Sequence, residues 1–178
     1  MRKTKFKCPR FNIDCPHKIS AIKNTCFIIV SYDNIHSKKI ESYLMEASKK
    51  ALRLKPVVAR KIKQTSSADL YCTKVCKPIQ EATACIIDLT YNNTNVGFEY
   101  GFAQTLGKPI ILTKFITDVP HLKPSEEKIL KEIKRRGSIQ YTVLPYRPPA
   151  DFSGVVRVEY KNKNDLISQL KSDFKISK

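Results

Sequence analysis

The stretch that most constrains the fold spans residues 84–112, ACIIDLTYNNTNVGFEYGFAQTLGKPIIL. Residues 84–89 are apolar and rich in β-branched side chains, which is typical of a strand buried on both faces. Residues 90–95 are polar and include three asparagines, so an exposed loop is expected there. A strand that leads through a loop into a helix and a further strand indicates a parallel α/β unit.

The helix that follows this loop places Glu99 near a strand end. Asn95 can cap its first turn, and Gly107 with Pro109 ends it, because glycine accepts the left-handed conformation and proline cannot continue a helix. The next strand is expected at 109–113. Glu99 therefore lies one turn into the helix, above the carboxyl end of a parallel strand, where open α/β sheets bind their ligands.

The rest of the chain continues this alternation of strands and helices. Residues 26–31 predict a first strand, and 37–54 predict a helix because apolar side chains recur at three- and four-residue steps. Further helices are expected at 68–82, 125–136 and 165–174, and further strands at 56–60, 138–144 and, as an extra edge strand, 155–160. These elements predict an α/β three-layer sandwich with a mostly parallel, five-stranded, flavodoxin-like sheet in the order 2-1-3-4-5. Strands 26–31, 84–89 and 109–113 are expected to lie parallel and adjacent at its centre.

Length and composition set the expected domain organisation. A chain of 178 residues with 42% hydrophobic residues suits one globular domain. We expect residues 1–25 to form a basic, cysteine-containing N-terminal segment that wraps onto a single α/β domain at 26–178. No apolar run reaches the ~18 residues that span a bilayer, and the basic start of the chain lacks the apolar core of a secretory signal. These features predict a cytoplasmic protein with no membrane partner.

The formal net charge of +17 bears on the partners of the chain. Such a positive balance favours polyanions such as nucleic acid, or an anionic substrate drawn in by the electric field of the protein. The lysines are spread along the whole chain, however, and no nucleic-acid-binding motif accompanies them. A solvated basic surface explains the charge more simply, so nucleic-acid binding is the less favoured alternative. Self-association into a homo-oligomer stays open.

The cysteines form no C-x-x-C pair and lie at positions 8, 15, 26, 72, 76 and 85. Cys26 and Cys85 fall within predicted strands and are expected to be buried and to bind nothing. No metal site is predicted. The weak candidates, with His17 nearby, are Cys8 and Cys15, each followed by proline, and the i, i+4 pair Cys72 and Cys76. Disulfides are an alternative for these four cysteines, and plain structural thiols are the simplest one.

The residues around Glu99 also resemble a known superfamily. The ordered elements D-L-T, N-x-N-V, F-E-Y-G-x-A and L-G-K-P are similar to those of nucleoside 2-deoxyribosyltransferases and TIR-like nucleotide-binding domains. The matching positions are Asp88, Leu89, Thr90, Asn93, Asn95, Val96, Glu99, Gly101, Ala103, Gly107, Lys108 and Pro109. In that superfamily the glutamate attacks or stabilises the anomeric carbon of a nucleoside or of NAD. The resemblance therefore implies Glu99 as a catalytic residue.

The candidate substrate-binding residues follow strands that end at the same edge of the predicted sheet. They are Ser31, Tyr32, Asp33, Arg60, Thr90, Asn93 and Asn95. Asp88 is the second catalytic candidate, and with Asp33 it could hold ribose hydroxyls or the leaving base. Relatives often have acidic residues after the arginine that Arg60 resembles. Here Lys61 and Lys63 follow, and this basic pair suits phosphate groups instead.

Two classes of function remain. The first is an N-ribosyl hydrolase or transferase that acts on a nucleoside, nucleotide or NAD, in which the Glu99 carboxylate stabilises positive charge on the ribose or traps it covalently. The alternative is a non-catalytic nucleotide-binding or sensing module of the TIR-like type. Glu99 would then only stabilise the start of its helix. No cofactor is expected, and NAD enters only as a substrate or ligand.

Overall fold

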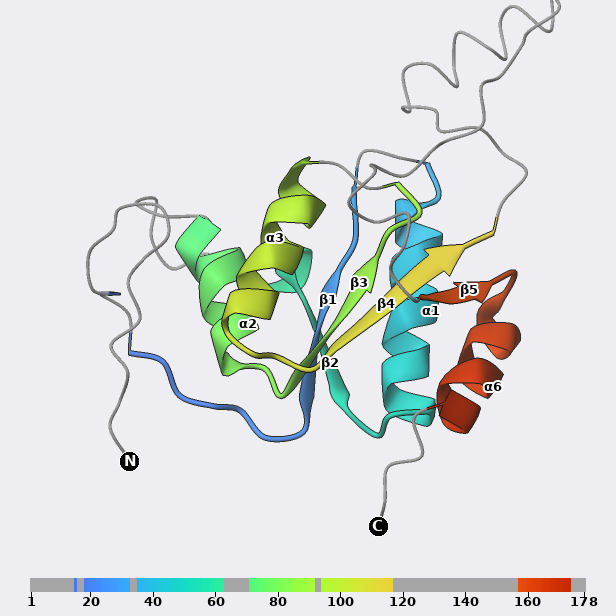
Figure 1. The fold of residues 1–178 in the computed structure, drawn as a ribbon, viewed down its shortest axis with the longest axis horizontal. Helices are drawn as coiled ribbons and strands as arrows, with labels where there is room; N and C mark the ends of the chain where they lie inside the picture. Colours follow the sequence, from blue (N-terminus) through green and yellow to red (C-terminus); the bar gives the residue numbers. More distant parts are fainter. Residues whose placement is uncertain are drawn as a thin grey trace, which may run out of the picture.

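The structure is a computed structural model that describes residues 15, 18–32, 35–62, 71–91, 94–116 and 157–173. Strands and helices alternate along these residues (Figure 1). The strands are β1 (Thr25–Ile29), β2 (Lys55–Val58), β3 (Ala84–Asp88), β4 (Ile110–Phe115) and β5 (Val158–Tyr160). The α-helices are α1 (Ser37–Lys50), α2 (Lys77–Glu81), α3 (Thr94–Thr105) and α6 (Lys163–Asp173), with a 3-10 turn η1 (Ala59–Lys61) and a π-helical turn η2 (Cys72–Cys76).

The five strands form one sheet in the order β2-β1-β3-β4-β5, and every neighbouring pair is parallel. In Figure 1 the helices α1 and α6 lie on one side of this sheet, and α2 and α3 lie on the other. The predicted three-layer, flavodoxin-like architecture and its strand order are therefore confirmed. The expectation that β1, β3 and β4 are parallel neighbours at the centre of the sheet is also confirmed.

The fifth strand of the sheet is β5, which the sequence predicted only as an extra edge strand. Val158–Tyr160 pairs with β4 from Thr113 onward. Its side chains alternate, since Val158 and Tyr160 are buried and Glu159 is exposed. The strand expected at 138–144 and the helix expected at 125–136 lie outside the described residues.

The core is divided by the two-residue period of the strands. Ile28 of β1 and Ile86 of β3 pack on the side of α1 and α6, whereas Ile29 and Ile87 pack on the side of α2 and α3. Successive side chains of a strand point to opposite faces of its sheet. Because both faces are covered by helices, β1 and β3 are buried along their whole length, which explains their continuous apolar sequences.

The segment around α2 departs from a regular helix because of Pro78. Proline has no backbone N–H, so it breaks the usual hydrogen-bond ladder unless it lies in the first turn of a helix. Here Pro78 lies in the first turn of α2, directly after the π-helical turn Cys72–Cys76. In the helix expected at 68–82, Pro78 predicts a kink or a split, and the described part consists of two consecutive turns of different geometry.

Lys108 forms hydrogen bonds that connect the turn before β4 with the end of α2. Its ammonium group donates to the carbonyl oxygens of Gln80 at 2.6 Å and Ala82 at 2.7 Å. The last carbonyl groups of a helix have no partner within the helix, so a cation there satisfies them. The chain reaches Lys108 through Gly107, whose φ of 62° lies in the left-handed region that glycine tolerates.

We expect Lys108→Met to lower the free energy of unfolding by about 1–2 kcal/mol, because two carbonyl groups lose a charged donor. Urea unfolding followed by circular dichroism measures this loss. The matched control is Lys77→Met on α2, where the ammonium group lies 3.9 Å from Glu81 and the side chain is 40% exposed. Such an exposed pair contributes little, so equal losses in the two variants would contradict the role of Lys108.

Candidate functional site

A small cavity lies where the carboxyl end of β1 meets the start of α3. Its volume is about 170 Å³, and it is lined by Phe27, Ile28, Ile29, Val30, Ser31, Tyr32, Ala59, Asn95 and Glu99. This is below the ~300–1,000 Å³ of pockets for drug-sized ligands. A cavity of this volume can enclose one ring of a ligand, and the remaining groups of a larger ligand would lie outside it. We call this cavity the β1–α3 pocket.

Four of the predicted site residues meet in this pocket. Ser31 and Tyr32 reach it from the end of β1, and Asn95 and Glu99 reach it from the first turns of α3. Strands β1 and β3 are parallel neighbours, so the chain leaves both at the same edge of the sheet. Glu99 and Tyr32 therefore line one cavity at this edge of the sheet. Asp33 and Asn93 lie outside the described residues.

Glu99 is a half-buried carboxyl group with no ion pair among the described residues. Burial raises its pKa from 4.5 to about 7, because a low-dielectric environment disfavours the charged form. No hydrogen bond or ion pair joins Glu99 to another residue of the described segments. Near neutral pH the group is therefore divided between its charged and neutral forms, which is the range that acid–base and nucleophilic chemistry uses.

Asp88 lies on the opposite side of the sheet from Glu99, which corrects the expectation that both acids face one cleft. Its neighbour Ile87 points toward α2 and α3, so the two-residue period turns Asp88 toward α1 and α6. Asp88 is 1% exposed. Its carboxylate accepts hydrogen bonds from the Thr90 amide at 3.0 Å, the Thr113 hydroxyl at 3.0 Å and the Tyr160 hydroxyl at 3.2 Å.

The surroundings of Asp88 assign it a structural role. Burial raises its pKa from 3.8 to about 6, although the hydrogen bonds from Thr90, Thr113 and Tyr160 act in the opposite direction. Thr90 has a similar position, since it is 3% exposed and its hydroxyl accepts a 2.7 Å hydrogen bond from the Phe115 amide. Neither residue lines the β1–α3 pocket. The predicted catalytic role of Asp88 and the predicted substrate contact of Thr90 do not fit this geometry.

Arg60 lies beside the pocket and is anchored by an acid that the sequence analysis missed. The Glu41 side chain of α1 is fully buried, and its Oε2 accepts hydrogen bonds from Arg60 Nε at 2.6 Å and from the Tyr32 hydroxyl at 2.5 Å. Arg60 Nη2 donates to Glu41 Oε1. The spacing of the helix could have indicated that Glu41 is buried. Glu41 lies three residues before Leu44 and so shares the buried side of α1.

The cysteines are mostly buried. Cys26 and Cys85 are 0% exposed, as predicted, and desolvation by burial raises the pKa of each thiol to about 12. Cys72 and Cys76 are buried on η2, and Cys15 is half-buried. Within the described segments no group of His, Cys, Asp and Glu is arranged to hold a metal ion. Cys8 and His17 lie outside those segments, so the question of a metal site that includes them stays open.

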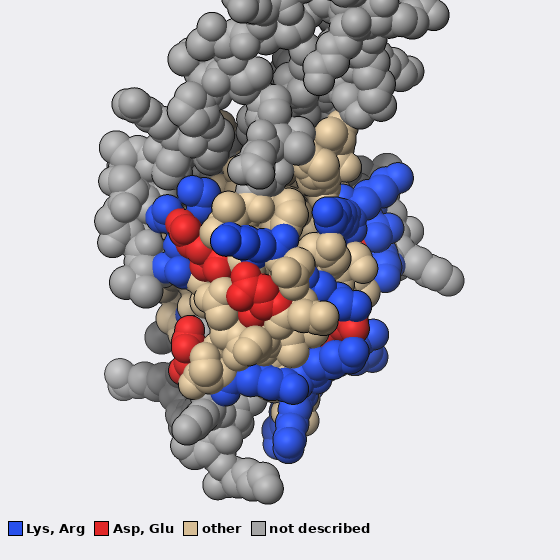
Figure 2. Space-filling model, turned by 90° about the vertical axis from the view of Figure 1, so that its right-hand side faces the viewer, with Lys and Arg blue, Asp and Glu red and all other residues tan. Residues whose placement is uncertain are grey.

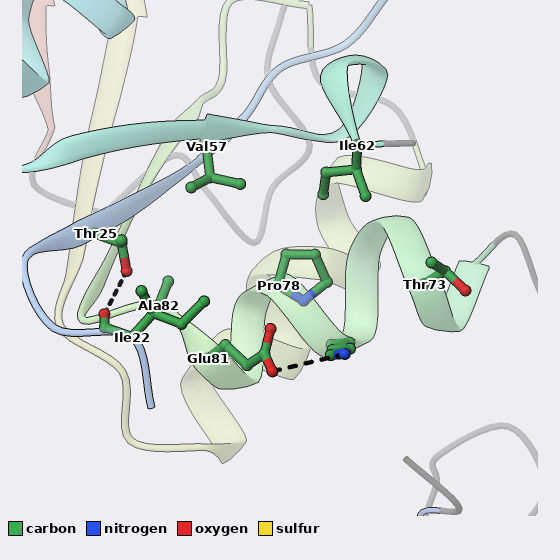
Figure 3. A pocket seen from close by; sticks show the side chains of 9 residues that line it. Ile22, Thr25, Val57, Ile62, Thr73, Pro78, Glu81 and Ala82 are labelled. Carbon is green, nitrogen blue, oxygen red and sulfur yellow. Dashed lines mark hydrogen bonds and ion pairs between the residues drawn. The ribbon is translucent and has the colours of Figure 1, made fainter. Parts of the chain in front are cut away.

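A second cavity, of about 340 Å³, lies between β2 and α2 (Figure 3). Its lining is largely apolar and includes Ile22, Val57, Ile62, Pro78 and Ala82. Its one acid, Glu81, is paired with Lys77 at 3.9 Å, and Thr25 donates to the Ile22 carbonyl at 2.6 Å. This larger cavity therefore offers no unpaired acid or nucleophile, and the β1–α3 pocket is the better candidate for chemistry.

The charged surface gives no single nucleic-acid-binding stripe on the face drawn in Figure 2. Lys and Arg side chains there surround acidic side chains and leave uncharged areas between them. Some of the basic side chains are paired, since Arg157 lies 2.9 Å from Glu159 and Lys163 lies 3.0 Å from Glu46. Among the described helices none has the length and apolar character needed to cross a bilayer.

Comparisons with known proteins give distant similarity in structure alone. No protein-family model matches the chain, and no curated protein matches it in sequence. Among solved structures, a 2-desoxiribosyltransferase from Leishmania mexicana is similar with a TM-score of 0.48 and 15% sequence identity, over 85% of this chain and 99% of that one. A likeness this distant carries no argument about function, which must come from the site itself.

We expect the stability of the protein to fall as the pH rises from about 4.5 to about 7, and Glu99→Gln to remove part of this fall. The folded state holds the Glu99 proton more tightly than the unfolded state, because the pKa rises from 4.5 to about 7 on folding. Ionisation therefore favours unfolding across this window. Above pH 7 Glu99→Gln should be more stable than wild type by about 1–3 kcal/mol. Denaturant titrations at pH 4.5 and pH 8 test this, and an unchanged difference between the two proteins would contradict the burial of Glu99.

Asp88→Ala should lower the free energy of unfolding by at least about 2 kcal/mol, because the Thr90 amide and two buried hydroxyls lose their acceptor. Asp173→Ala, at an exposed carboxylate near the end of α6, is the control and should change stability little. If Asp88 were a ligand-binding residue instead, Asp88→Ala would weaken nucleotide binding at temperatures where the variant is fully folded. Isothermal titration calorimetry on the folded variant distinguishes these outcomes.

Proposed function

We propose that this protein binds a nucleoside or nucleotide in the β1–α3 pocket and cleaves its N-glycosidic bond as an N-ribosyl hydrolase or transferase. The observation that carries the proposal is the position of Glu99. Its carboxyl group, with a pKa raised to about 7, lines the same cavity as Ser31, Tyr32 and Asn95 at the carboxyl edge of the sheet. The superfamily resemblance of the sequence around Glu99 supports the same chemistry.

Glu99 acts on the anomeric carbon of the sugar. One carboxylate oxygen forms a bond to that carbon as the bond to the base nitrogen breaks, and the base leaves with the bonding electron pair and takes up a proton from water. A water molecule, or a second base in a transferase, then attacks the same carbon. This second attack breaks the ester to Glu99 and regenerates the carboxylate. Positive charge develops on the sugar in both steps, and the unpaired Glu99 carboxylate stabilises it.

The other pocket residues suit a polar sugar. The Ser31 hydroxyl and the Asn95 amide can exchange hydrogen bonds with ribose hydroxyl groups. Tyr32 is 41% exposed, and its hydroxyl already donates to Glu41. Its ring is therefore oriented, and it presents an aromatic face to the sugar or the base. NAD falls within this substrate class, because it also contains an N-ribosyl bond, and no cofactor takes part in the proposed reaction.

The decisive experiment measures base release by chromatography from a panel of nucleosides, nucleoside monophosphates and NAD. Glu99→Gln keeps the size of the side chain and removes its charge, so turnover should fall by at least about 100-fold while substrate affinity changes little. The control variant is Glu46→Gln, which removes a partly exposed carboxylate of α1 that pairs with Lys50 and Lys163. Its turnover should equal that of the wild type.

The pH dependence provides a second test of the same role. The attacking group must be ionised, so kcat/KM should rise with pH through about 7, the pKa of Glu99, and then level off. Base release that Glu99→Gln leaves intact would exclude Glu99 as the catalytic group. Ligand binding without base release from any member of the panel would instead support a nucleotide-binding module.

A further inference from the structure

We propose that Arg60 forms a phosphate-binding subsite at the edge of the β1–α3 pocket, so that the site prefers nucleotides to free nucleosides. This inference rests on the proposed function, because it assigns the substrate class of the same pocket. Arg60 follows Ala59, which lines the pocket, and its guanidinium shares the Glu41 carboxylate with Tyr32, another lining residue.

The guanidinium of Arg60 is held in one orientation. Its Nε and Nη2 groups both donate to Glu41, which is fully buried in α1. The Tyr32 hydroxyl donates to the same Glu41 oxygen as Arg60 Nε. Glu41 is thus held from two elements, and a preorganised cation loses less conformational freedom when it binds a ligand than a free side chain does.

Glu41 does not use all the hydrogen-bonding capacity of Arg60. A guanidinium carries five N–H donors, and Glu41 takes two of them. The Arg60 side chain is 47% exposed although its partner is completely buried. Part of this side chain therefore reaches solvent next to Ala59 and Tyr32, which line the pocket. The planar arrangement of the guanidinium donors matches two oxygen atoms of a phosphate group.

The charges around Arg60 favour an anion. Glu41 offsets one positive charge, but Lys61 follows Arg60 directly, and Lys38 lies in the first turn of α1. Both lysines are exposed, and that first turn contains no acidic residue. The positive end of the α1 dipole lies in the same turn. With a neutral nucleoside bound, the remaining N–H groups of Arg60 would donate to water. With a nucleotide bound, they would donate to the phosphate oxygens.

Equilibrium binding tests this subsite independently of turnover. Isothermal titration calorimetry on Glu99→Gln protein, which keeps substrates intact, compares a nucleoside with its 5′-monophosphate and with inorganic phosphate. The monophosphate should bind at least about 10-fold more tightly than the nucleoside, since hydrogen bonds to charged groups contribute about 1.5–3 kcal/mol. Adding Arg60→Gln should abolish this preference, and nucleoside affinity should fall far less than monophosphate affinity. Inorganic phosphate should compete with the monophosphate and not with the nucleoside.

Two further variants keep the test informative. Lys61→Gln removes the neighbouring charge and should retain most of the preference, whereas Arg60→Lys should lose most of it because lysine lacks the planar pair of donors. If Arg60→Gln misfolds because Glu41 is left unpaired, the double variant Arg60→Gln, Glu41→Gln removes both charges and replaces it.

Equal affinity of the starting protein for nucleoside and monophosphate would overturn the subsite, as would equal losses of both ligands in Arg60→Gln. Base release from nucleosides without any phosphate preference would overturn the subsite alone. Phosphate-selective binding without base release from any substrate would overturn the catalytic proposal alone.

Discussion

The buried carboxylate of Asp88 joins three adjacent strands at the edge of the sheet that carries the site. It belongs to β3, it accepts from Thr113 of β4 and Tyr160 of β5, and it also accepts from the amide of Thr90 in the following turn. The Leu89 amide adds a 2.8 Å hydrogen bond to the Thr113 carbonyl. These hydrogen bonds fix the direction in which the chain leaves β3. They thereby help to position the start of α3.

This arrangement separates two acidic groups, Asp88 and Glu99, that belong to the same β3–α3 segment of the chain. The Asp88 group lies on the α1 and α6 side, where it is dry and fully paired. Glu99 lies on the other side, half-buried and with access to the pocket. The first group gives the strand ends a rigid geometry, because buried polar groups with all partners present hold one arrangement. The second group has no hydrogen bond or ion pair to the residues that the structure describes, and burial raises its pKa to about 7.

Sequence patterns were sufficient to predict the strand order of the sheet and four of the residues that line the β1–α3 pocket. Continuous apolar runs identified β1, β3 and β4, and their alternation with helices gave the strand order. The position of Glu99 followed from chain direction alone. Asp88 was misassigned because a carboxylate after a buried strand looks the same whether it faces ligand or core. Its partner Tyr160 is 72 residues away, and such pairings depend on tertiary contacts. Glu41 was missed for the same reason, since its partners Tyr32 and Arg60 follow two different strands.

The edges of the sheet have a consequence for how this chain behaves among copies of itself. One outer strand, β2, is four residues long and contains Pro56, and the other, β5, is three residues long and carries the exposed Glu159. Proline lacks a donor for a new partner strand, and short or charged edges discourage pairing between chains. Molecules crowded together during synthesis are thereby hindered from extending one sheet into the next, which limits aggregation.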